Sequence, residues 1–288
     1  MDAVIEVPMA SPLTGLLREE TLLLRWLFGY ADRIPSSIGP YMAKKLYHAG
    51  IKLVRFISLD VDALRGHHGV IQQLHMGVSI LDASRLRPPA KKAPTTGVLS
   101  EAIASHHFAV GSSKSGRRAS NRFLFGTSEA VSLAELKEKL GELTSDENVV
   151  LVGHGCKREL DILETLGINL HPVCDIDTVK AAQHPLQLSY RYSLQRLLEE
   201  LGIPFANLHT AGNDAHFVLR ALLMVAVRDA ERKLGHPEQP WLSICRAIAQ
   251  GPRPPTKAEK RCARITAKQR RRESVTTPTD SRRRSPPI

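Results

Sequence analysis

The pattern of hydrophobic and polar positions predicts a chain of short strands followed by alternating helices and strands. Apolar runs typical of strands stand, in chain order, at residues 53–59, 70–81, 105–111, 149–152 and 173–174. Apolar side chains at the spacing of one helix face mark residues 132–143, 156–166, 193–201 and 217–227. Three consecutive strands followed by alternating helices and strands are typical of a mixed sheet covered by helices, so we expect an α/β fold with five strands.

Several of these elements have recognisable ends. Ser132 and Glu135 stand in the spacing of a capping box, which predicts a helix start. Glycines follow the predicted strand at 149–152 and the helices at 156–166 and 193–201. In the helix predicted at residues 156–166, the apolar face is expected to consist of Cys156, Leu160, Leu163 and Leu166.

Residues 1–50 are expected to form a helical extension of the main domain. Its first predicted helix carries apolar residues at Leu16, Leu17, Leu23, Leu24, Leu27 and Phe28. A second short helix is predicted from Pro40 to His48, ending at Gly50. The sequence leaves two interpretations open: helices packed against the main domain, or a helix that binds a partner.

The positive charge of the chain is concentrated at its C-terminal end. Residues 251–288 hold twelve Lys or Arg and three acidic residues, a net of +9 out of +11, which leaves +2 for residues 1–250. This composition predicts a disordered basic tail, with a basic helix over Thr256–Glu273 as an alternative. Such a tail can be a nuclear-import signal, a nucleic-acid contact through phosphate charge, or simply a solvated end.

The expected organisation is therefore a helical extension, an α/β domain, a helical linker and a basic tail, over residues 1–50, 51–232, 233–250 and 251–288. No apolar run approaches the roughly 18 residues that a membrane span needs, and the start lacks the pattern of a secretory signal. The four cysteines show no paired metal spacing. We therefore expect a reduced, intracellular protein of the nucleus or cytoplasm that does not associate with membranes.

Acidic side chains from separated elements suggest a metal site. Asp60 and Asp62 follow the first strand and lie two residues apart, so they project from the same strand face. Glu159 lies on the helix after the fourth strand, and His209 and Asp214 stand where the last long helix begins. Carboxylate oxygens are the ligands that Mg²⁺ or Mn²⁺ prefers. Two such ions can promote phosphodiester hydrolysis, with a histidine as the general base.

Other polar residues near these positions have simpler interpretations. Asp161 competes with Glu159, but the two lie about 200° apart around a helix and cannot both face one site. His154 is expected to be a hydrogen-bonding residue at the strand end, and Asp177 a helix cap. His106 and His107 are neighbours in a predicted strand and would point to opposite faces. Asp175 and His216 are not expected to act in the chemistry.

Three stretches carry a resemblance to a known family. They are Ser58-Leu59-Asp60-Val61-Asp62-Ala63, Leu151-Val152-Gly153-His154-Gly155-Cys156-Lys157-Arg158-Glu159 and Leu208-His209-Thr210-Ala211-Gly212-Asn213-Asp214-Ala215. With them the chain resembles the DEDDh (DnaQ-like) 3′–5′ exonucleases of the ribonuclease H-like superfamily, in particular a fungal branch. The segment from Gln73 to Asp82 also looks like the second strand of that family. The resemblance covers about residues 50–230, and its third motif is the most specific.

The resemblance implies a ribonuclease H-like fold and a metal-dependent 3′–5′ exonuclease. The substrate would be single-stranded RNA or DNA, with RNA favoured, and the products nucleoside monophosphates. Asp60 would bridge two Mg²⁺ or Mn²⁺ ions, Asp62 and Asp214 would hold one of them, and Glu159 would support the other. His209 would be the general base.

Two departures from the family pattern keep other functions open. Asp62 stands where the family has Glu, and Glu159 where it has Asp. Each change moves the carboxylate oxygens by about a methylene, and catalytic geometry tolerates only about 0.5 Å. The alternatives are a catalytically inactive module that binds nucleic acid or a protein partner in RNA metabolism, and an adaptor that uses residues 1–50 and the tail. The sequence does not predict the oligomeric state.

Overall fold

The computed structural model describes residues 15–33, 35–36, 38–40, 43–44, 54–65, 71–86, 101–111, 121–145, 148–155, 157–235 and 239–276. They fall into two compact units, one within Met1–Arg253 and the other within Pro254–Ile288. The first unit contains the sheet and the helices packed on it, and the second contains one helix. The domain borders expected from the sequence remain a prediction.

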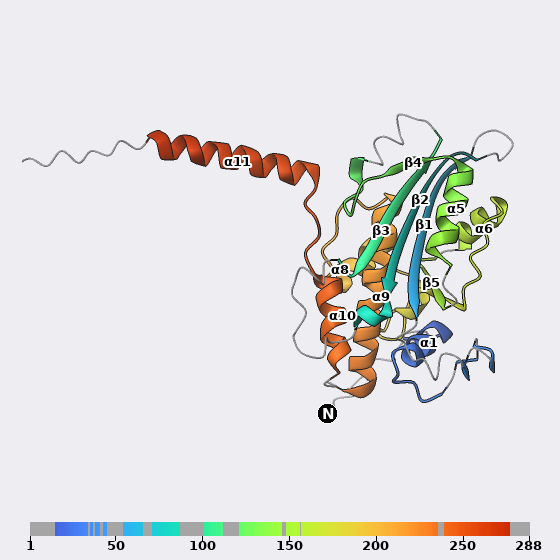
Figure 1. Ribbon diagram of the computed structural model, residues 1–288. Helices are drawn as coiled ribbons and strands as arrows, with labels where there is room; N and C mark the ends of the chain where they lie inside the picture. Colours follow the sequence, from blue (N-terminus) through green and yellow to red (C-terminus); the bar gives the residue numbers. More distant parts are fainter. Residues whose placement is uncertain are drawn as a thin grey trace, which may run out of the picture. The chain divides into compact units, whose positions relative to one another are not determined.

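A mixed sheet of six described strands forms the centre of the first unit, in the order β4-β3-β2-β1-β5-β6 (Figure 1). The strands are β1 (Arg55–Arg65), β2 (Ile71–Asp82), β3 (Ile103–Val110), β4 (Glu129–Val131), β5 (Val149–Gly153) and β6 (Cys174–Asp177). Strands β1, β2 and β3 pair antiparallel, whereas β4, β5 and β6 join parallel to their neighbours. The predicted α/β fold with a mixed sheet is confirmed.

The sheet has one strand more than the five expected. Strand β4 is only three residues long and half-exposed or exposed, so it lacks the alternating apolar pattern that marks a strand. It pairs with the last three residues of β3. Strand β1 is also longer than expected, because it stays paired with β2 as far as Arg65. Asp60 and Asp62 therefore lie within the strand and not at its end.

Helices cover both faces of the sheet (Figure 1). On one face α1 (Glu19–Leu27), α7 (Thr178–Ala181), α8 (Leu194–Glu200), α9 (Ala211–Leu234) and α10 (Pro240–Gln250) share an apolar core with strand residues such as Phe56 and Val150. On the other face α5 (Leu133–Leu143) and α6 (Lys157–Thr165) pack on the alternate strand residues, such as Ile57 and Leu151. A short 3₁₀ turn (Ala83–Leu86) follows β2. The two cores result from the alternation of side chains along each strand.

The helix starts agree with the sequence better than the helix faces do. Ser132 and Glu135 form the predicted capping box at α5. In α6, however, Ile162 and Leu163 are buried while Leu160 is 38% exposed, so the predicted face is wrong at that residue. Leu16 and Leu17 precede α1 and are likewise exposed instead of buried. Most of the predicted second helix, Pro40–His48, lies outside the described residues.

The basic tail contains a helix, α11 (Lys257–Thr276), where disorder was the first expectation. Lys, Arg, Ala, Glu and Gln have high helix propensity, which compensates for the lack of an apolar face. The helix begins at a reciprocal cap in which Thr256 N donates to Glu259 Oε2 (2.7 Å) and Glu259 N donates to Thr256 Oγ1 (3.2 Å). Across the described residues, none of the helices combines the length and apolar character of a membrane span.

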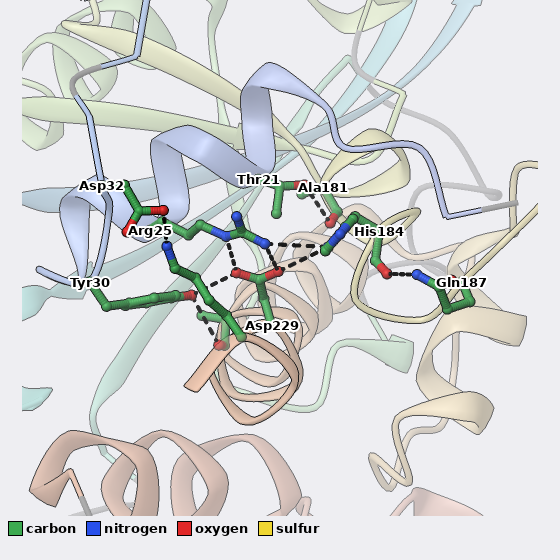
Figure 2. A network of polar contacts seen from close by, with 10 residues as sticks. Thr21, Arg25, Tyr30, Asp32, Ala181, His184, Gln187 and Asp229 are labelled. Carbon is green, nitrogen blue, oxygen red and sulfur yellow. Dashed lines mark hydrogen bonds and ion pairs between the residues drawn. The ribbon is translucent and has the colours of Figure 1, made fainter. Parts of the chain in front are cut away.

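A buried polar network joins helix α1 to helix α9 (Figure 2). Arg25 donates from Nε to Asp229 Oδ2 (2.7 Å) and from Nη2 to Oδ1 (2.9 Å). Tyr30 donates to the same carboxylate (3.2 Å), and His184 Nδ1 lies 3.3 Å from it. The Asp229 side chain is fully buried, and Leu23, Leu24 and Leu27 of α1 lie in the core nearby. This packing favours the interpretation of residues 15–33 as part of the main domain.

Replacing Asp229 with alanine should destabilise the protein strongly. The substitution leaves the Arg25 guanidinium buried without its counter-charge, and breaking a buried pair from one side typically costs about 3–5 kcal/mol. Urea unfolding followed by circular dichroism measures the change. Asp32→Ala is the matched control, because Asp32 pairs with Lys233 at the exposed surface and its loss should change stability far less. Equal effects of both substitutions would contradict the stabilising role of the buried pair.

Candidate active site

A pocket opens where strand β1 extends past strand β5. The two strands pair in parallel only as far as Ser58 and Val152, while β1 continues to Arg65. In sheets of this type, ligands bind in the crevice at the carboxyl ends of parallel strands. The pocket has a volume of about 300 Å³ and is lined by Leu59, Asp60, His154, Glu159, Ser193, Leu194, Gln195, Leu208, His209, Asp214 and Val218.

Four of the five predicted site residues therefore line one pocket. Asp60 comes from β1 and Glu159 from the first turn of α6, and both are half-buried. Asp214 comes from the first turn of α9 and is buried, whereas His209 precedes that helix and is exposed. Three elements far apart in sequence thus bring three carboxylates and one imidazole to the same cavity.

Asp62 is the exception among the predicted residues. Its side chain is exposed, and it is not part of the pocket lining. Burial is the main cause of the raised pKa of Asp60, Glu159 and Asp214, and the charge of Asp62 raises the pKa of each of them further. Asp62 therefore contributes to the electrostatics of the pocket from its edge.

Two glycines allow helix α9 to reach the sheet. A Cβ atom at Gly77 of β2 would lie 1.9 Å from the carbonyl oxygen of Ala211, at the first turn of α9. A Cβ at Gly212 would lie 2.8 Å from the Cβ of His107. Gly77 is also the residue directly opposite Asp60 in the β1–β2 pair. The close approach of backbone to backbone thus places the start of α9, with Asp214, beside Asp60.

The loop before α9 is held by the side chain of Asn213. Asn213 Nδ2 donates to the carbonyl oxygens of Arg122 (3.0 Å) and Asn207 (2.9 Å), and its Oδ1 accepts from Leu124 N (2.9 Å). Arg122 in turn donates from Nη2 to the carbonyl oxygen of Leu208 (2.8 Å). No role for Asn213 is predicted from the sequence, because Arg122 and Leu124 lie about 90 positions away in the chain.

His209 occupies an unusual backbone conformation for a residue other than glycine, with φ of +60°. Such a conformation costs free energy and persists where the surrounding structure holds it. Hydrogen bonds from Asn213 to the carbonyl oxygen of Asn207 and from Arg122 to that of Leu208 restrain the backbone just before His209.

Burial and mutual repulsion make the carboxylates of the pocket hard to ionise. Burial raises the pKa of Asp214 to about 7, although the backbone amides of His209 and Thr210 donate to it and partly offset this effect. Burial, followed by the neighbouring carboxylates, raises the pKa of Asp60 well above its ordinary value. Burial also raises the pKa of Glu159. Like charges in a desolvated pocket produce such shifts, and a cation among them would reverse the effect.

The donor atoms of the pocket fit a hard divalent cation. Within the described residues, Glu159 Oε2 and Asp214 Oδ1 are buried atoms that lack a hydrogen-bond partner. Buried polar atoms of this kind are rare unless an ion or water completes them. No three acidic, histidine or cysteine side chains in the described part of the chain are gathered closely enough to hold one ion as they stand. The fit therefore rests on the donor chemistry and on the unpartnered oxygens.

Of the polar residues near the predicted site, His154 and Asp177 have the structural roles expected from the sequence. His154 Nε2 donates to the carbonyl oxygen of Tyr192 (3.2 Å), and its Nδ1 lies 2.9 Å from Thr178 Oγ1. Asp177 accepts from Val179 N (3.0 Å) and caps α7, while Asp161 is exposed on α6. His154 thus lines the pocket and is held by two hydrogen-bond partners, whereas Asp161 is not among the lining residues.

The remaining histidines named from the sequence lie outside the pocket lining. His106 and His107 point to opposite faces of β3, as strand alternation requires. His107 is buried, with Nδ1 2.6 Å from Ser128 Oγ. His216 is buried on α9, where its Nε2 accepts from Arg220 Nε (3.0 Å). His107 and His216 are therefore buried structural residues, whereas His106 is half-buried.

The chain is similar to one protein family and to one curated protein. The model of a DEDDh family, described as DNA polymerase III subunit epsilon-like, C-terminal domain, matches residues 55–225. A curated protein of Schizosaccharomyces pombe, described as an uncharacterized nucleolar protein, is 33% identical over 110 residues. That alignment covers 35% of this chain and 45% of the relative, so the chain matches less than half of the relative's length. The family match includes both strands of the pocket and the start of α9.

Proposed function

The chain belongs to the DEDDh exonuclease family, and from that premise we propose that it is a metal-dependent 3′–5′ exonuclease. The substrate would be single-stranded RNA or DNA, and the product a nucleoside monophosphate. The single observation that carries the proposal is that Asp60, Glu159, His209 and Asp214 line one pocket. The raised pKa values of its three carboxyl groups are those expected of a site that binds a divalent cation.

The residues of the pocket suggest how the reaction proceeds. Asp60, Asp62, Glu159 and Asp214 would hold two Mg²⁺ or Mn²⁺ ions, which when bound make water a stronger nucleophile and stabilise the leaving oxygen. His209 accepts a proton from the water that attacks the last phosphodiester. The bond from phosphorus to the 3′ oxygen of the shortened strand breaks, and this oxygen takes a proton from solvent. The terminal nucleotide leaves as its 5′-monophosphate.

A direct assay tests this function. End-labelled single-stranded RNA and DNA are incubated with the full chain in Mg²⁺, in Mn²⁺ or in chelator, and the products are separated by size. Stepwise shortening from the 3′ end with release of mononucleotides, absent in chelator, is the expected result. Comparison of the two substrates also tests the preference for RNA. Internal cleavage, or no cleavage with either metal, would refute the proposal.

A catalytically silent binding module is the second candidate, and two observations favour it. Asp62 is shorter than the Glu expected in the resembled motif, and it is exposed outside the pocket lining. Glu159 is longer than the expected Asp. Such a module would bind nucleic acid, or a protein partner in RNA metabolism, without turnover.

The double substitution Asp62→Glu with Glu159→Asp separates the two candidates. Misplacement of a catalytic group by about 1 Å can cost about 100-fold in rate, so restored geometry should change the rate by a similar factor. A gain of this size from an inert parent would support the silent module. A loss from an active parent would show that the native pair is the working arrangement. Asp161→Glu is the matched control, because Asp161 is an exposed acid on the same helix as Glu159.

We also propose a nuclear location. The relative in S. pombe is described as nucleolar, and helix α11 is strongly basic, as expected of a nuclear-import signal or an RNA contact. Deletion of residues 254–288 in a fluorescently tagged chain tests the import role directly. An unchanged nuclear signal after deletion would exclude it.

A further inference from the structure

The segment that leads into helix α8 forms one rim of the pocket. Ser193, Leu194 and Gln195 line the cavity directly. Just before them, the carbonyl oxygen of Tyr192 accepts a hydrogen bond from His154 Nε2 (3.2 Å), and His154 is itself a lining residue. Residues 193–195 therefore form part of the pocket wall, and residues 190–192 and 196 adjoin them in the chain.

Two tyrosines and an arginine form a cluster on this rim. The rings of Tyr190 and Tyr192 lie with centroids 5.2 Å apart and an interplanar angle of 54°. The guanidinium carbon of Arg196 lies 4.8 Å from the Tyr192 ring centroid and 5.5 Å from that of Tyr190. We call these three residues the rim platform. They combine π-faces with a cation, the two features that single-stranded nucleic acids bind.

One tyrosine of the rim platform packs against the core, and the other is exposed to solvent. Tyr192 packs against the main apolar core, and the Ser193 hydroxyl accepts from Arg196 N (3.3 Å) at the start of α8. Tyr190 is 50% exposed, and it is the one aromatic residue among the large apolar side chains that stand open in the described part of the chain. The neighbouring Arg191 is also exposed. An aromatic ring held open beside two cations is poorly explained by core packing alone.

The size of the pocket leaves most of a polymeric substrate outside it. Its volume of about 300 Å³ is at the lower end of the range of small-ligand sites, which corresponds to one terminal nucleotide. The next nucleotides of the strand must therefore leave across a rim of the pocket. The rim platform belongs to the segment that forms one such rim, because residues 193–195 of that segment line the pocket.

We propose that the rim platform stacks an unpaired nucleobase of the substrate strand, next to the terminal nucleotide, with Arg196 beside the adjoining phosphate. The inference rests on the proposed function, because it places the strand's end in the carboxylate pocket. Stacking on aromatic rings accepts every base, so the platform favours single strands over duplexes without selecting a sequence.

Binding measurements without turnover test the platform. A fluorescent single-stranded oligonucleotide is titrated with the full chain in chelator at near-physiological salt, and fluorescence anisotropy gives the Kd. We expect Tyr190→Ala to weaken binding about 10-fold, within the range known for loss of one stacked base. Tyr190→Phe keeps the ring and should bind within twofold of the parent. Leu133→Ala, which truncates an exposed side chain on α5, is the matched control.

Abasic substitution in the oligonucleotide identifies the stacked base. An abasic site is placed in turn at the second, third and fourth nucleotides from the 3′ end. At one of these positions the parent should lose about the same factor as Tyr190→Ala, and the variant should lose nothing further, because the two changes remove one contact. Parental binding of Tyr190→Ala, or additive losses at every position, would overturn the proposal. So would failure of the parent to bind single strands.

This design separates the platform from the proposed enzyme activity. Absence of nucleotide release in the nuclease assay would remove the exonuclease function, while the binding result would still decide the role of Tyr190. Conversely, an active nuclease whose binding is indifferent to Tyr190 would retain its function and lose the platform.

Discussion

Replacing His209 with alanine or Asp214 with asparagine is expected to abolish release of mononucleotides from single-stranded substrates. Loss of a general base alone costs about 100- to 10,000-fold in rate. Asp214→Asn should cost at least as much, because it removes a buried carboxylate oxygen that the pocket offers to a cation. Single-turnover assays with end-labelled RNA in Mg²⁺ measure the rates. Asp161→Asn, an exposed acid on α6, should remain as active as the parent.

Stability measurements distinguish this loss from misfolding. The pKa of Asp214 in the folded chain is raised from 3.8 to about 7, so the stability that this group contributes below pH 3.8 is lost as the pH rises through about 7. In chelator at pH 8, Asp214→Asn should therefore unfold at an equal or higher urea concentration than the parent. Added Mg²⁺ should stabilise the parent more than the variant. A variant that is inactive and also less stable in chelator would contradict this account.

Substituting Gly77 with alanine should damage both the fold and the pocket. The new Cβ would lie 1.9 Å from the carbonyl oxygen of Ala211 and 2.5 Å from the amide nitrogen of Gly212, both of them backbone atoms that cannot rotate away. Overpacking typically costs about 1–3 kcal/mol, and we expect about 3 kcal/mol or more here because the start of α9 must move. Urea unfolding measures the loss of stability, and the nuclease assay measures the loss of activity.

Gly141→Ala is the control for this substitution. Gly141 lies on an exposed position of α5, and an added Cβ would meet nothing within 4 Å among the described residues. Alanine in a helix interior is more favourable than glycine by about 0.5–1 kcal/mol, so this variant should be slightly more stable than the parent. A Gly77→Ala variant with parental stability would show that α9 can shift without cost.

The elements and the candidate pocket could be predicted from local patterns because those patterns determine them. Apolar runs and helical spacing predicted the sheet, and the acids of the three motifs predicted the carboxylates that line one pocket. The exception is Asp62, which lies two residues beyond Asp60 on β1 and outside the pocket lining. Strand alternation fixes a face, whereas the extent of a pocket along that face depends on which helix covers it.

The residues missed by the sequence analysis act through long-range contacts. Asn213 joins two loops about 90 positions apart in the chain, and Gly77 matters only because α9 crosses it. Strand β4 exists through its pairing with β3 and not through its own composition. In each case the signal is a neighbour in space that no local pattern identifies. The exposure of Leu160 has the same origin, because the faces of α6 are decided by where the helix lies on the sheet.

The ion pair between Arg25 and Asp229 shows that part of the buried structure lies outside the region recognised as the family. The region recognisable as belonging to the family runs from 55 to 225, so both charged partners lie beyond its borders, and the second border falls inside α9. A fragment trimmed to those borders would cut that helix and uncover the apolar side chains now covered by α1 and α10. The region that matches the family model is thus smaller than the set of residues that encloses the apolar core.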